Sequence, residues 1–363
     1  TPDQETGRGF IFAPQVYTAA QLYPGRSITT GAPPMTTSND QLSESLELLR
    51  IIGDGHFHSG EEIGLAIGIS RSAVWKRIKK INLQFGVIIH GVTGRGYKLA
   101  QEMNALSPVS SFNGRCWSWD VALFSTLDST NAEALRRLEL GAHAPFAVVA
   151  EQQTAGRGRR GRVWASPFGE NIYFSLVLKV EQGIKQLAGL SLVVGLAVAS
   201  TLRAMGVKGV GLKWPNDVLA SGRKIAGVLL ELSGDLADVC HVVIGIGINA
   251  NMLHSAEPID QLWTSVSLEA GTLVDRNVLL ERLQVQLDGY LATHLAQGFS
   301  ALRDEWEQND LWRGRLVELS SGDSKVSGVA RGVDSTGALM LLVDGELKSF
   351  SGGELSLRLR HDS

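Results

Sequence analysis

Apolar residues recur at helical spacing in the first patterned segment of the chain. In "SESLELLRIIGDG" the positions Leu46, Leu49 and Ile52 predict an amphipathic helix that ends at a glycine. A capping box over Ser59–Glu62 and a second cap at Ser70 predict the starts of two further helices, separated by the tight turn "GIS". This arrangement predicts a helix-turn-helix, and the two β-like runs of "VIIHGVTGRGYKL" predict a wing after it.

Strand-like and helical patterns alternate over the middle of the chain. The strand-like runs are "FAVVAEQ", "NIYFSLVLKV", "GVGLKW", "KIAGVLLEL" and "HVVIGIGINAN", and helices are predicted over 131–140, 184–205 and 276–295. Tight turns such as "WPND" and "SGR" join several strands, so we expect hairpins and a mixed, largely antiparallel sheet. The uncharged run over 187–202 is shorter than the about 20 residues of a membrane-spanning helix, so we expect a buried core helix and no membrane contact.

The two ends of the chain differ from this middle part. Short strand-like runs near the C-terminus, such as "RLVELSS" and "SKVSGVARGV", predict a small β-barrel that leans on the central domain, because so short a chain buries little core of its own. The N-terminal residues lack periodicity, so we expect a tail that is disordered or artefactual. The predicted domains are this tail over 1–38, a winged helix-turn-helix over 40–104, a central domain over 112–310 and a barrel over 311–363.

The composition is that of an ordinary globular chain, with 363 residues of which 44% are hydrophobic and 20% charged. The formal net charge is −3, so any basic surface must be local. The two cysteines, Cys116 and Cys240, lie far apart without a second ligand nearby, which indicates buried free thiols in a reduced, cytoplasmic protein. No N-terminal segment combines a basic start with an apolar run, so we expect no secretory signal.

Charge is divided sharply within the predicted winged helix-turn-helix. Residues 41–70 carry five acidic side chains and one basic, whereas residues 71–98 carry seven basic side chains and no acidic one. The second helix and the wing would thus present a positive face to DNA, the alternative being an ordinary solvated helix face. The expected DNA contacts are Arg71, Ser72, Lys76, Arg77, Lys80 and Arg95. The nearby pair of His56 and His58 lacks a third ligand at a useful spacing, so we expect no metal there.

A second basic stretch lies in the central region. The arginine–glycine loop, residues 154–164, reads "TAGRGRRGRVW". Its glycines allow close approach of the backbone to a ligand, and its arginines offer forked donors for phosphate or carboxylate. No Gly-Lys-Ser/Thr or dinucleotide-binding spacing is present. By itself the loop is equally compatible with a solvated basic loop or an RNA contact.

Four further segments accompany the loop. "DSTNAEAL" places Ser129, Thr130 and Asn131 at a helix N-terminus, where hydroxyls and free N–H groups bind small polar ligands. "KWPND" is a turn with a carboxylate, "GRKIAGVLLEL" places Lys224 at a strand entry, and "GIGIN" is a strand with two glycines. Each segment alone is also explained as ordinary turn chemistry.

Taken in this order, the segments resemble the family of bifunctional biotin–protein ligases and biotin-operon repressors. The resemblance rests on "GRGRRGRVWASPFGENIYFS", "KWPND", "RKIAG" and "GIGIN" and covers roughly residues 41–360, while the N-terminal tail departs from it. It implies an α+β multidomain fold: an N-terminal winged helix-turn-helix, a class II synthetase-like ligase domain with a mixed sheet, and a C-terminal SH3-like β-barrel. It also implies an ATP-dependent ligase that makes biotinyl-5′-AMP and transfers biotin to a lysine of the acetyl-CoA carboxylase biotin carrier protein. With biotinyl-AMP bound, such a protein represses biotin synthesis genes.

The resemblance further implies the residues of the site. Biotin would contact Ser129, Thr130, Asn131, Gln153, Arg157, Gly158, Arg159 and Lys224. Among these, catalysis would rest on Lys224, Arg157 and Arg159. The nucleotide would contact Arg160, Arg162, Trp164, Asn216, Asp217, Asn249 and Trp263. Trp263 would stack on adenine, the alternative being a core tryptophan, and Mg²⁺ would accompany ATP without fixed protein ligands.

The implied partners are the biotin carboxyl carrier protein, operator DNA and, with the adenylate bound, a second copy of the chain. We expect residues 171–190 to form the face between the two copies. Two alternatives stay open. A lipoate–protein ligase would need a long apolar tunnel, which the polar "DSTN" and Gln153 disfavour. A ligand-sensing repressor without catalysis would not need Lys224 and the intact loop.

Overall fold

The computed structural model describes most of the chain that follows the predicted tail. The described residues are 40–107, 119–180, 183–235, 240–255, 258–321, 324–351 and 355–359. The tail over 1–38 and Cys116 lie outside them. The domain boundaries given above stay predictions.

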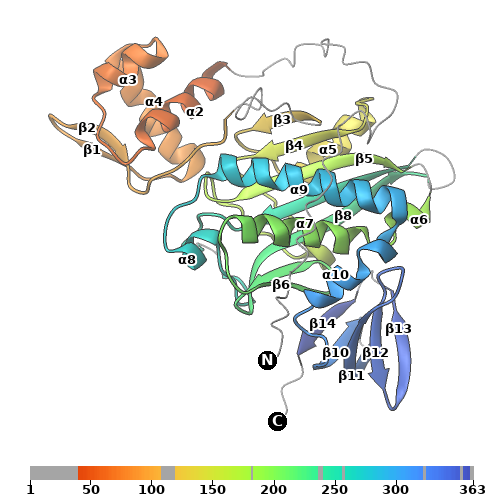
Figure 1. Cartoon of the computed structure of the whole chain (residues 1–363). Helices are drawn as coiled ribbons and strands as arrows, with labels where there is room; N and C mark the ends of the chain where they lie inside the picture. The colour runs from red at the N-terminus through yellow and green to blue at the C-terminus, as the bar shows by residue number, and fades with distance from the viewer. Residues whose placement is uncertain are drawn as a thin grey trace, which may run out of the picture.

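A compact group of helices with a two-stranded sheet forms the first part of the described chain (Figure 1). Its elements are α2 (Asp40–Ile52), α3 (Gly60–Ile67), α4 (Arg71–Phe85) and the antiparallel strands β1 (Ile89–Val92) and β2 (Gly96–Leu99). Ser59 and Glu62 form the predicted capping box at α3, and the Ser70 hydroxyl accepts from the amide of Ala73 at the start of α4. The predicted helix-turn-helix and wing are confirmed.

A seven-stranded sheet forms the centre of the described chain, in the order β3-β4-β5-β9-β8-β7-β6. Its strands are β3 (Asp120–Phe124), β4 (Phe146–Ala150), β5 (Ile172–Val180), β6 (Val210–Lys213), β7 (Asp217–Ala220), β8 (Arg223–Gly234) and β9 (Cys240–Ile248). β3 and β4 are parallel and the other neighbours are antiparallel, which confirms a mixed, largely antiparallel sheet. The sequence pattern does not predict β3, which reaches β4 through α5 (Thr130–Glu139) because parallel strands need a crossover.

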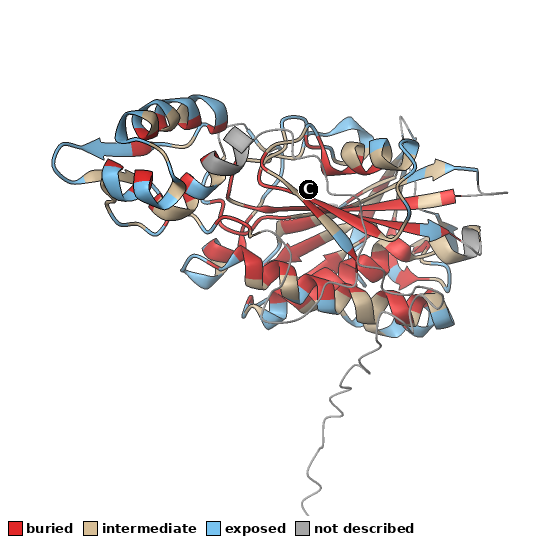
Figure 2. Ribbon diagram, turned by 90° about the horizontal axis from the view of Figure 1, so that it is seen from above, coloured by how far each residue is buried: buried red, intermediate tan, exposed pale blue. Residues whose placement is uncertain are grey.

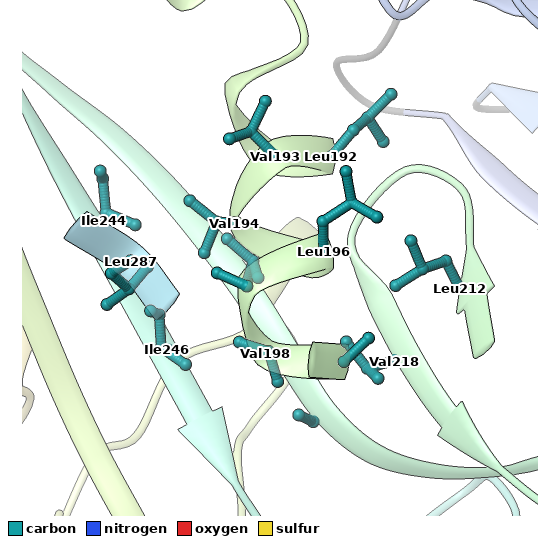
Figure 3. Packing of buried hydrophobic residues seen from close by; sticks show 14 of the residues in the cluster. Leu192, Val193, Val194, Leu196, Val198, Leu212, Val218, Ile244, Ile246 and Leu287 are labelled. Carbon is teal, nitrogen blue, oxygen red and sulfur yellow. The ribbon is translucent and has the colours of Figure 1, made fainter. Parts of the chain in front are cut away.

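Helices cover both faces of this sheet. α5 contacts β4, β5 and β9 on one face, whereas α7 (Leu190–Ala204) lies on the other, with α9 (Arg276–Gln297) against it (Figure 1). Figure 3 shows Val194 and Leu196 of α7 packed among Leu212 of β6 and Ile246 of β9. Seen from above, the buried residues concentrate in the sheet and the helices beside it (Figure 2). No helix in the described part of the chain is long and apolar enough to cross a membrane.

The prediction of a single helix over 184–205 is wrong at one point. The structure divides it into α6 (Ile184–Leu187) and α7, with Gly189 between them at φ 70°. This left-handed conformation favours glycine. A Cβ on Gly189 would also overlap the ring of Phe299, so the break is fixed by a contact with a residue distant in sequence.

The dimer face predicted over 171–190 is also wrong for its strand. β5 pairs with β4 on one side and with β9 on the other, so neither edge is open. Lys179 is its one exposed residue, and the other eight are buried. A strand enclosed in this way has no surface to offer to a second copy of the chain.

The C-terminal part of the described chain is an antiparallel five-stranded sheet in the order β13-β12-β11-β10-β14. Its strands are β10 (Leu316–Ser321), β11 (Ser324–Val333), β12 (Leu339–Val343), β13 (Glu346–Phe350) and β14 (Ser356–Leu359). The indole N–H of Trp214 donates to the carbonyl of Gly337 at 3.1 Å, and Val317 and Leu341 belong to the same buried core as α7. The small all-β domain and its dependence on the central domain are thus confirmed. The short helices α8 (Val266–Ala270) and α10 (Arg303–Gln308) complete the assignment.

The winged helix-turn-helix is docked on the central domain through buried contacts. Phe168, in the segment between the arginine–glycine loop and β5, lies in the core of the winged helix-turn-helix and stacks on Phe85 of α4 with ring centroids 4.3 Å apart. The fully buried Arg276 of α9 lies 2.7 Å from Glu151 and donates to the carbonyl of Asn104 in the connecting segment. The exit of the loop is therefore attached to α4.

Candidate active site

Glycines in two neighbouring strands line the base of a pocket on the face of the sheet that bears α5. In β9 the "GIGI" alternation turns isoleucines into the core and Gly245 and Gly247 to the opposite face. Gly227 of β8 pairs directly with Gly247. A Cβ on Gly247 would meet the ring of Trp164 at 2.5 Å, and one on Gly245 would overlap the amide of Asn131. The missing side chains make room for Trp164 and Asn131, which line a pocket of about 970 Å³ that is partly open to solvent.

Uncharged polar groups at the N-terminus of α5 line one end of the pocket. Ser129 caps the helix by accepting from a backbone amide of its first turn. The amide and hydroxyl of Thr130 donate to the side-chain oxygen of Gln153 at 2.9 and 3.2 Å. Ser175 Oγ lies 2.8 Å from Thr130 Oγ1 and 2.6 Å from Asn131 Oδ1. The structure thus brings together all four predicted polar residues, Ser129, Thr130, Asn131 and Gln153.

Two lysines that share one carboxylate line the other end. Lys224 Nζ lies 2.7 Å from Asp217 Oδ1, and Lys213 Nζ lies 3.3 Å from Asp217 Oδ2. Lys224 reaches this position because the pairing of β7 with β8 shifts by one residue, which leaves Ile225 without a partner. Ile225 and Ala226 both point into the core, so Lys224 is turned to the pocket by a β-bulge.

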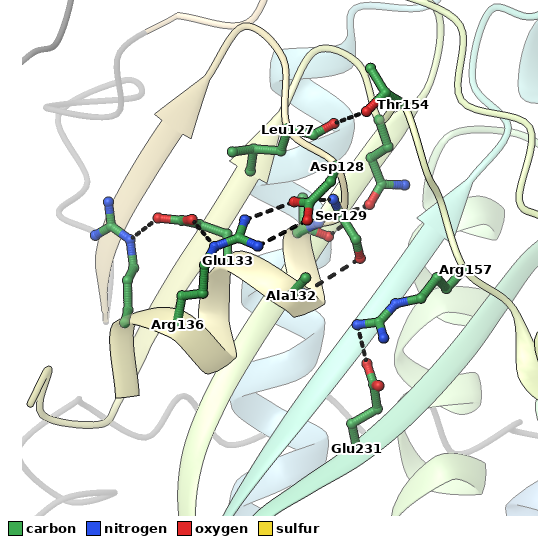
Figure 4. A network of polar contacts seen from close by, with 12 residues as sticks. Leu127, Asp128, Ser129, Ala132, Glu133, Arg136, Thr154, Arg157 and Glu231 are labelled. Atoms are coloured by element: carbon green, nitrogen blue, oxygen red, sulfur yellow. Dashed lines mark hydrogen bonds and ion pairs between the residues drawn. The ribbon is translucent and has the colours of Figure 1, made fainter. Parts of the chain in front are cut away.

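The arginine–glycine loop is fastened across the pocket at two places. Arg157 Nη2 lies 3.2 Å from Glu231 Oε2 of β8 (Figure 4). Arg159 donates to Asn216 Oδ1 at 3.1 Å and to the carbonyl of Leu355, from the C-terminal part of the chain, at 3.2 Å. The four arginines of the loop all line the pocket.

The electrostatics of the pocket favour an anion. Among its described lining residues are six cations, Arg157, Arg159, Arg160, Arg162, Lys213 and Lys224, and a single carboxylate, Asp217. Burial lowers the pKa of the Arg159 guanidinium, and burial lowers the pKa of Lys213 despite its contact with Asp217. Burial alone would raise the pKa of the Asp217 carboxyl, but the charges of Lys224 and Lys213 outweigh it and lower that pKa. A bound carboxylate or phosphate would relieve the cost of these clustered positive charges.

Two predicted residues do not line the pocket. The amide of Asn249 is buried and donates to the carbonyl of Thr264 at 2.9 Å, which is a structural contact between chain segments. Trp263 is half-buried and lies beside β8. The residues before and after Trp263 hydrogen-bond to the backbone of Lys224. A nucleotide role for either residue stays a prediction.

Sequence reasoning missed several residues that the structure adds to the site. Lys213 opens the quoted "KWPND" and could have been found from that motif. Ser175 and Glu231 lie inside strands and show no local signal, because their partners are distant in sequence. The segment 355–357 of the C-terminal part also lines the pocket, which no pattern in that part indicates.

A second surface lies on α4 and the wing. Of the predicted DNA contacts, Arg77 is half-buried and the other five are exposed. Trp75, absent from the prediction, stands 48% exposed on the same helix with Lys79 Nζ 3.9 Å from its ring centroid. An exposed indole among basic side chains suits a nucleic-acid surface, since it adds apolar contact to charge. Their roles stay predictions.

The histidine pair lies in the segment before α3, where the backbone of His58 pairs with Tyr97 of the wing strand β2. His58 Nε2 lies 3.0 Å from Asp54 Oδ1, and His56 Nδ1 lies 3.7 Å from Asp54 Oδ2. In the described ranges, no group of three or more His, Cys, Asp or Glu side chains is arranged to hold a metal ion. The side chains of this pair thus contact Asp54 of the same segment.

The pocket can accommodate a ligand with two different ends. Its hydroxyl and amide groups suit an uncharged polar ring that both donates and accepts hydrogen bonds, whereas its cationic end suits a carboxylate next to phosphate. The strand glycines let Trp164 and Asn131, two side chains that line the pocket, pack directly on the sheet. Preorganised cations beside two anions favour a reaction that joins a carboxylate to a phosphate.

The comparisons with known proteins agree with this geometry. The Biotin/lipoate A/B protein ligase family matches residues 123–249, an HTH domain matches 44–98, and the Biotin protein ligase C terminal domain matches 314–358. The chain is 42% identical to the bifunctional ligase/repressor BirA of Salmonella typhimurium, over 86% of this chain and 97% of the relative. It is 30% identical to that of Bacillus subtilis over the same shares of the two chains. Among solved structures, the biotin protein ligase from Aquifex aeolicus in complex with biotin and ATP matches with a TM-score of 0.58 at 32% identity, covering 66% of this chain and 99% of that one.

Proposed function

The chain belongs to the family of bifunctional biotin ligase/repressors, and from that premise we propose how its pocket makes biotinyl-AMP and passes the biotin on. The reaction is that of an ATP-dependent biotin–[acetyl-CoA-carboxylase] ligase. The observation that supports this use of the pocket is its division into a neutral polar end and a cationic end on one glycine floor. Biotin has a ureido ring at one end and a carboxylate at the other, which suits both ends at once.

The ureido ring is assigned to the N-terminus of α5. Ser129, Thr130, Asn131 and Gln153 provide hydroxyls and amides that can satisfy its N–H and C=O groups. These side chains already hydrogen-bond one another, so the end is preorganised before the ligand enters. These polar residues do not form the long apolar tunnel that lipoate would require.

The carboxylate and the α-phosphate of ATP are assigned to the cationic end. A carboxylate oxygen of biotin attacks the α-phosphorus, the bond between this phosphorus and the oxygen that bridges to the β-phosphate breaks, and pyrophosphate leaves. Mg²⁺, when bound with ATP, would supply further positive charge for the phosphates. Lys224, Arg157 and Arg159 lower the repulsion between the two anions and hold them in line. Arg160, Arg162, Trp164, Asn216 and Asp217 line the space left for the nucleotide.

The second step, the transfer of biotin to the carrier, takes place in the same pocket. The amine of a carrier lysine attacks the acyl carbon of biotinyl-AMP, the bond to the phosphate oxygen breaks, and AMP leaves while the amine loses its proton. The mixed anhydride must be kept from water until the carrier arrives. The arginine–glycine loop, fastened by Arg157 and Arg159 across the pocket, is assigned this shielding role. We assign the reaction to the cytoplasm, where ATP, the carrier protein and the chromosomal DNA are all present.

A pyrophosphate exchange assay tests the ligase assignment. Labelled pyrophosphate should enter ATP only when the chain, Mg²⁺ and biotin are all present, and lipoate should not replace biotin. Exchange with lipoate but not with biotin would identify the chain as a lipoate–protein ligase. Absence of exchange at every Mg²⁺ concentration would leave a ligand-sensing repressor without catalysis.

The chain also carries a repressor domain, and we propose that the adenylate controls it through dimerisation. A single winged helix makes few base contacts, and repressors commonly reach useful affinity as dimers on paired half-sites. The adenylate can shift this equilibrium only if it binds the dimer more tightly than the monomer. Because carrier protein consumes the adenylate, repression would begin when no unbiotinylated carrier remains.

Sedimentation and operator binding at one fixed salt concentration test this control, since phosphate contacts make affinity salt-dependent. Biotinyl-AMP should raise both the dimer fraction and the affinity for DNA upstream of the biotin synthesis genes. Equal affinity with and without the adenylate would rule out the coupling and leave the ligase assignment intact.

A further inference from the structure

One carboxylate oxygen holds two residues of the pocket at once. Glu231 Oε2 lies 2.7 Å from Asn131 Nδ2 and 3.2 Å from Arg157 Nη2. Asn131 belongs to α5, Arg157 to the arginine–glycine loop and Glu231 to β8, so three separate segments meet at this atom. Figure 4 shows the Arg157 guanidinium pointing down onto the Glu231 carboxylate.

The contact with Glu231 decides how the Asn131 amide is oriented. A carboxylate only accepts hydrogen bonds, so the NH₂ group of Asn131 must face Glu231. The Asn131 oxygen then faces Ser175 Oγ at 2.6 Å. Asn131 is buried and lies directly on Gly245, where a Cβ would overlap the whole amide group. Without Glu231, Asn131 Nδ2 would keep only its contact of 3.5 Å with the carbonyl of Leu229, so the buried amide would be held more weakly.

The contact with Arg157 fastens the loop on the side of β8. The base of the loop is held by the amides of Thr154 and Ala155, which donate to carbonyls of the segment before α5 at 2.8 Å each. Further along, Arg159 is held from the opposite side of the pocket by Asn216. The ion pair with Glu231 is therefore the anchor that keeps the first arginine of the loop above the strand floor.

We propose that Glu231 is a positioning residue of the biotin site, which fixes the Asn131 amide and anchors the arginine–glycine loop through Arg157. It acts through these two residues and forms no part of the reacting groups. The inference rests on the proposed assignment of the polar end to biotin. It makes the acidic residue of "VLLEL" a determinant of biotin affinity and of loop order.

Three variants of the full chain test this role. Glu231→Ala removes both contacts and should raise the KM for biotin in pyrophosphate exchange about tenfold, with the KM for ATP changed by less than about twofold, because a buried amide that is held more weakly loosens the end that holds biotin. Glu231→Gln keeps an acceptor for Asn131 but loses the charge that pairs with Arg157, so its biotin KM should rise by less than about threefold. Glu318→Gln is the matched control, because Glu318 forms an ion pair of 3.0 Å with Lys325 at similar exposure and neither residue lines the pocket. It should behave as the wild type.

Limited trypsin digestion of the ligand-free chain provides a readout that needs no activity. Trypsin cleaves after arginine, and the loop contains four of them. Both Glu231→Gln and Glu231→Ala should be cleaved within 157–162 several-fold faster than the wild type and the Glu318→Gln control. In the Asn131→Ala background, Glu231→Ala should change biotin KM far less than in the wild type, because the two side chains act as a unit.

The outcomes separate this inference from the proposed function. Wild-type biotin KM and wild-type cleavage in both Glu231 variants, with unchanged melting temperatures, would overturn the positioning role. An additive effect of Glu231→Ala and Asn131→Ala would overturn it as well. If the wild type shows no biotin-dependent exchange, the proposed function fails, while the trypsin comparison still reports whether Glu231 anchors the loop.

Discussion

At the scale of single residues, the position of Lys224 depends on an irregularity in β8. In a regular strand, Lys224 would share the core-facing side of Ala226, because side chains alternate. The bulge at Ile225 reverses this relation and brings Lys224 Nζ to 2.7 Å from Asp217 Oδ1. A bulge that aims one side chain into a site is a recurrent device next to active sites.

Replacing this lysine tests its electrostatic role. Lys224→Ala should slow adenylate formation about 100-fold or more, roughly 3 kcal/mol, because it removes a preorganised charge beside the developing anion. Single-turnover formation of labelled biotinyl-AMP measures this rate. Lys208→Ala, which removes an exposed lysine on a turn after α7, should leave it unchanged. A rate for Lys224→Ala within a few-fold of the control would refute the role.

At the scale of elements, the residues of β9 alternate between the core and the pocket. Its isoleucines pack under α7, while Gly245 and Gly247 leave room for Asn131 and Trp164 on the side of the pocket. Gly245→Ala should therefore displace the Asn131 amide and raise the KM for biotin about tenfold, since overpacking costs about 1–3 kcal/mol. Gly289→Ala in α9 is the matched control, because a Cβ there meets nothing within 4 Å. Equal biotin KM in the two variants would show that the glycine floor is not needed.

The same scale shows what the sequence could and could not predict. Local patterns were sufficient for the caps at Ser59 and Ser70, for most strands of the central sheet and for the polar residues before α5, because these depend on neighbours in the chain. The break at Gly189, the bulge at Ile225 and the contacts of Glu231 depend on partners far away in sequence. No periodicity reports such contacts, so they required the structure.

At the scale of the whole molecule, the arginine–glycine loop and the winged helix-turn-helix are connected through a short segment that follows the loop. Phe168 follows the loop by four residues and lies in the core of the winged helix-turn-helix against Phe85. A change in the loop can thus reach α4 through packed side chains. Coupling of this kind needs a contiguous contact with two arrangements, and this stack is the place to look for it.

Phe168→Ala should loosen that attachment. Loss of a buried phenylalanine typically costs about 3–5 kcal/mol, so the amides of α4 should exchange with solvent considerably faster. Phe146→Ala provides the control, because Phe146 is 6% exposed, against 5% for Phe168, but packs between the sheet and α5. Native-state hydrogen exchange followed by mass spectrometry measures both. Unchanged exchange in α4 for Phe168→Ala would show that the docking does not stabilise the winged helix-turn-helix.

Retention of the adenylate in the pocket is the role proposed for the arginine–glycine loop. Arg159→Gly removes the anchor to Asn216 and to the Leu355 carbonyl, together with one of the cations. The direct measurement is the release of labelled biotinyl-AMP from the loaded chain in a filter assay, with the exposed Arg71→Ala of α4 as control. We predict release many times faster from Arg159→Gly, with biotin appearing on bystander proteins, and wild-type retention in Arg71→Ala. Equal retention in Arg159→Gly and the wild type would contradict the account.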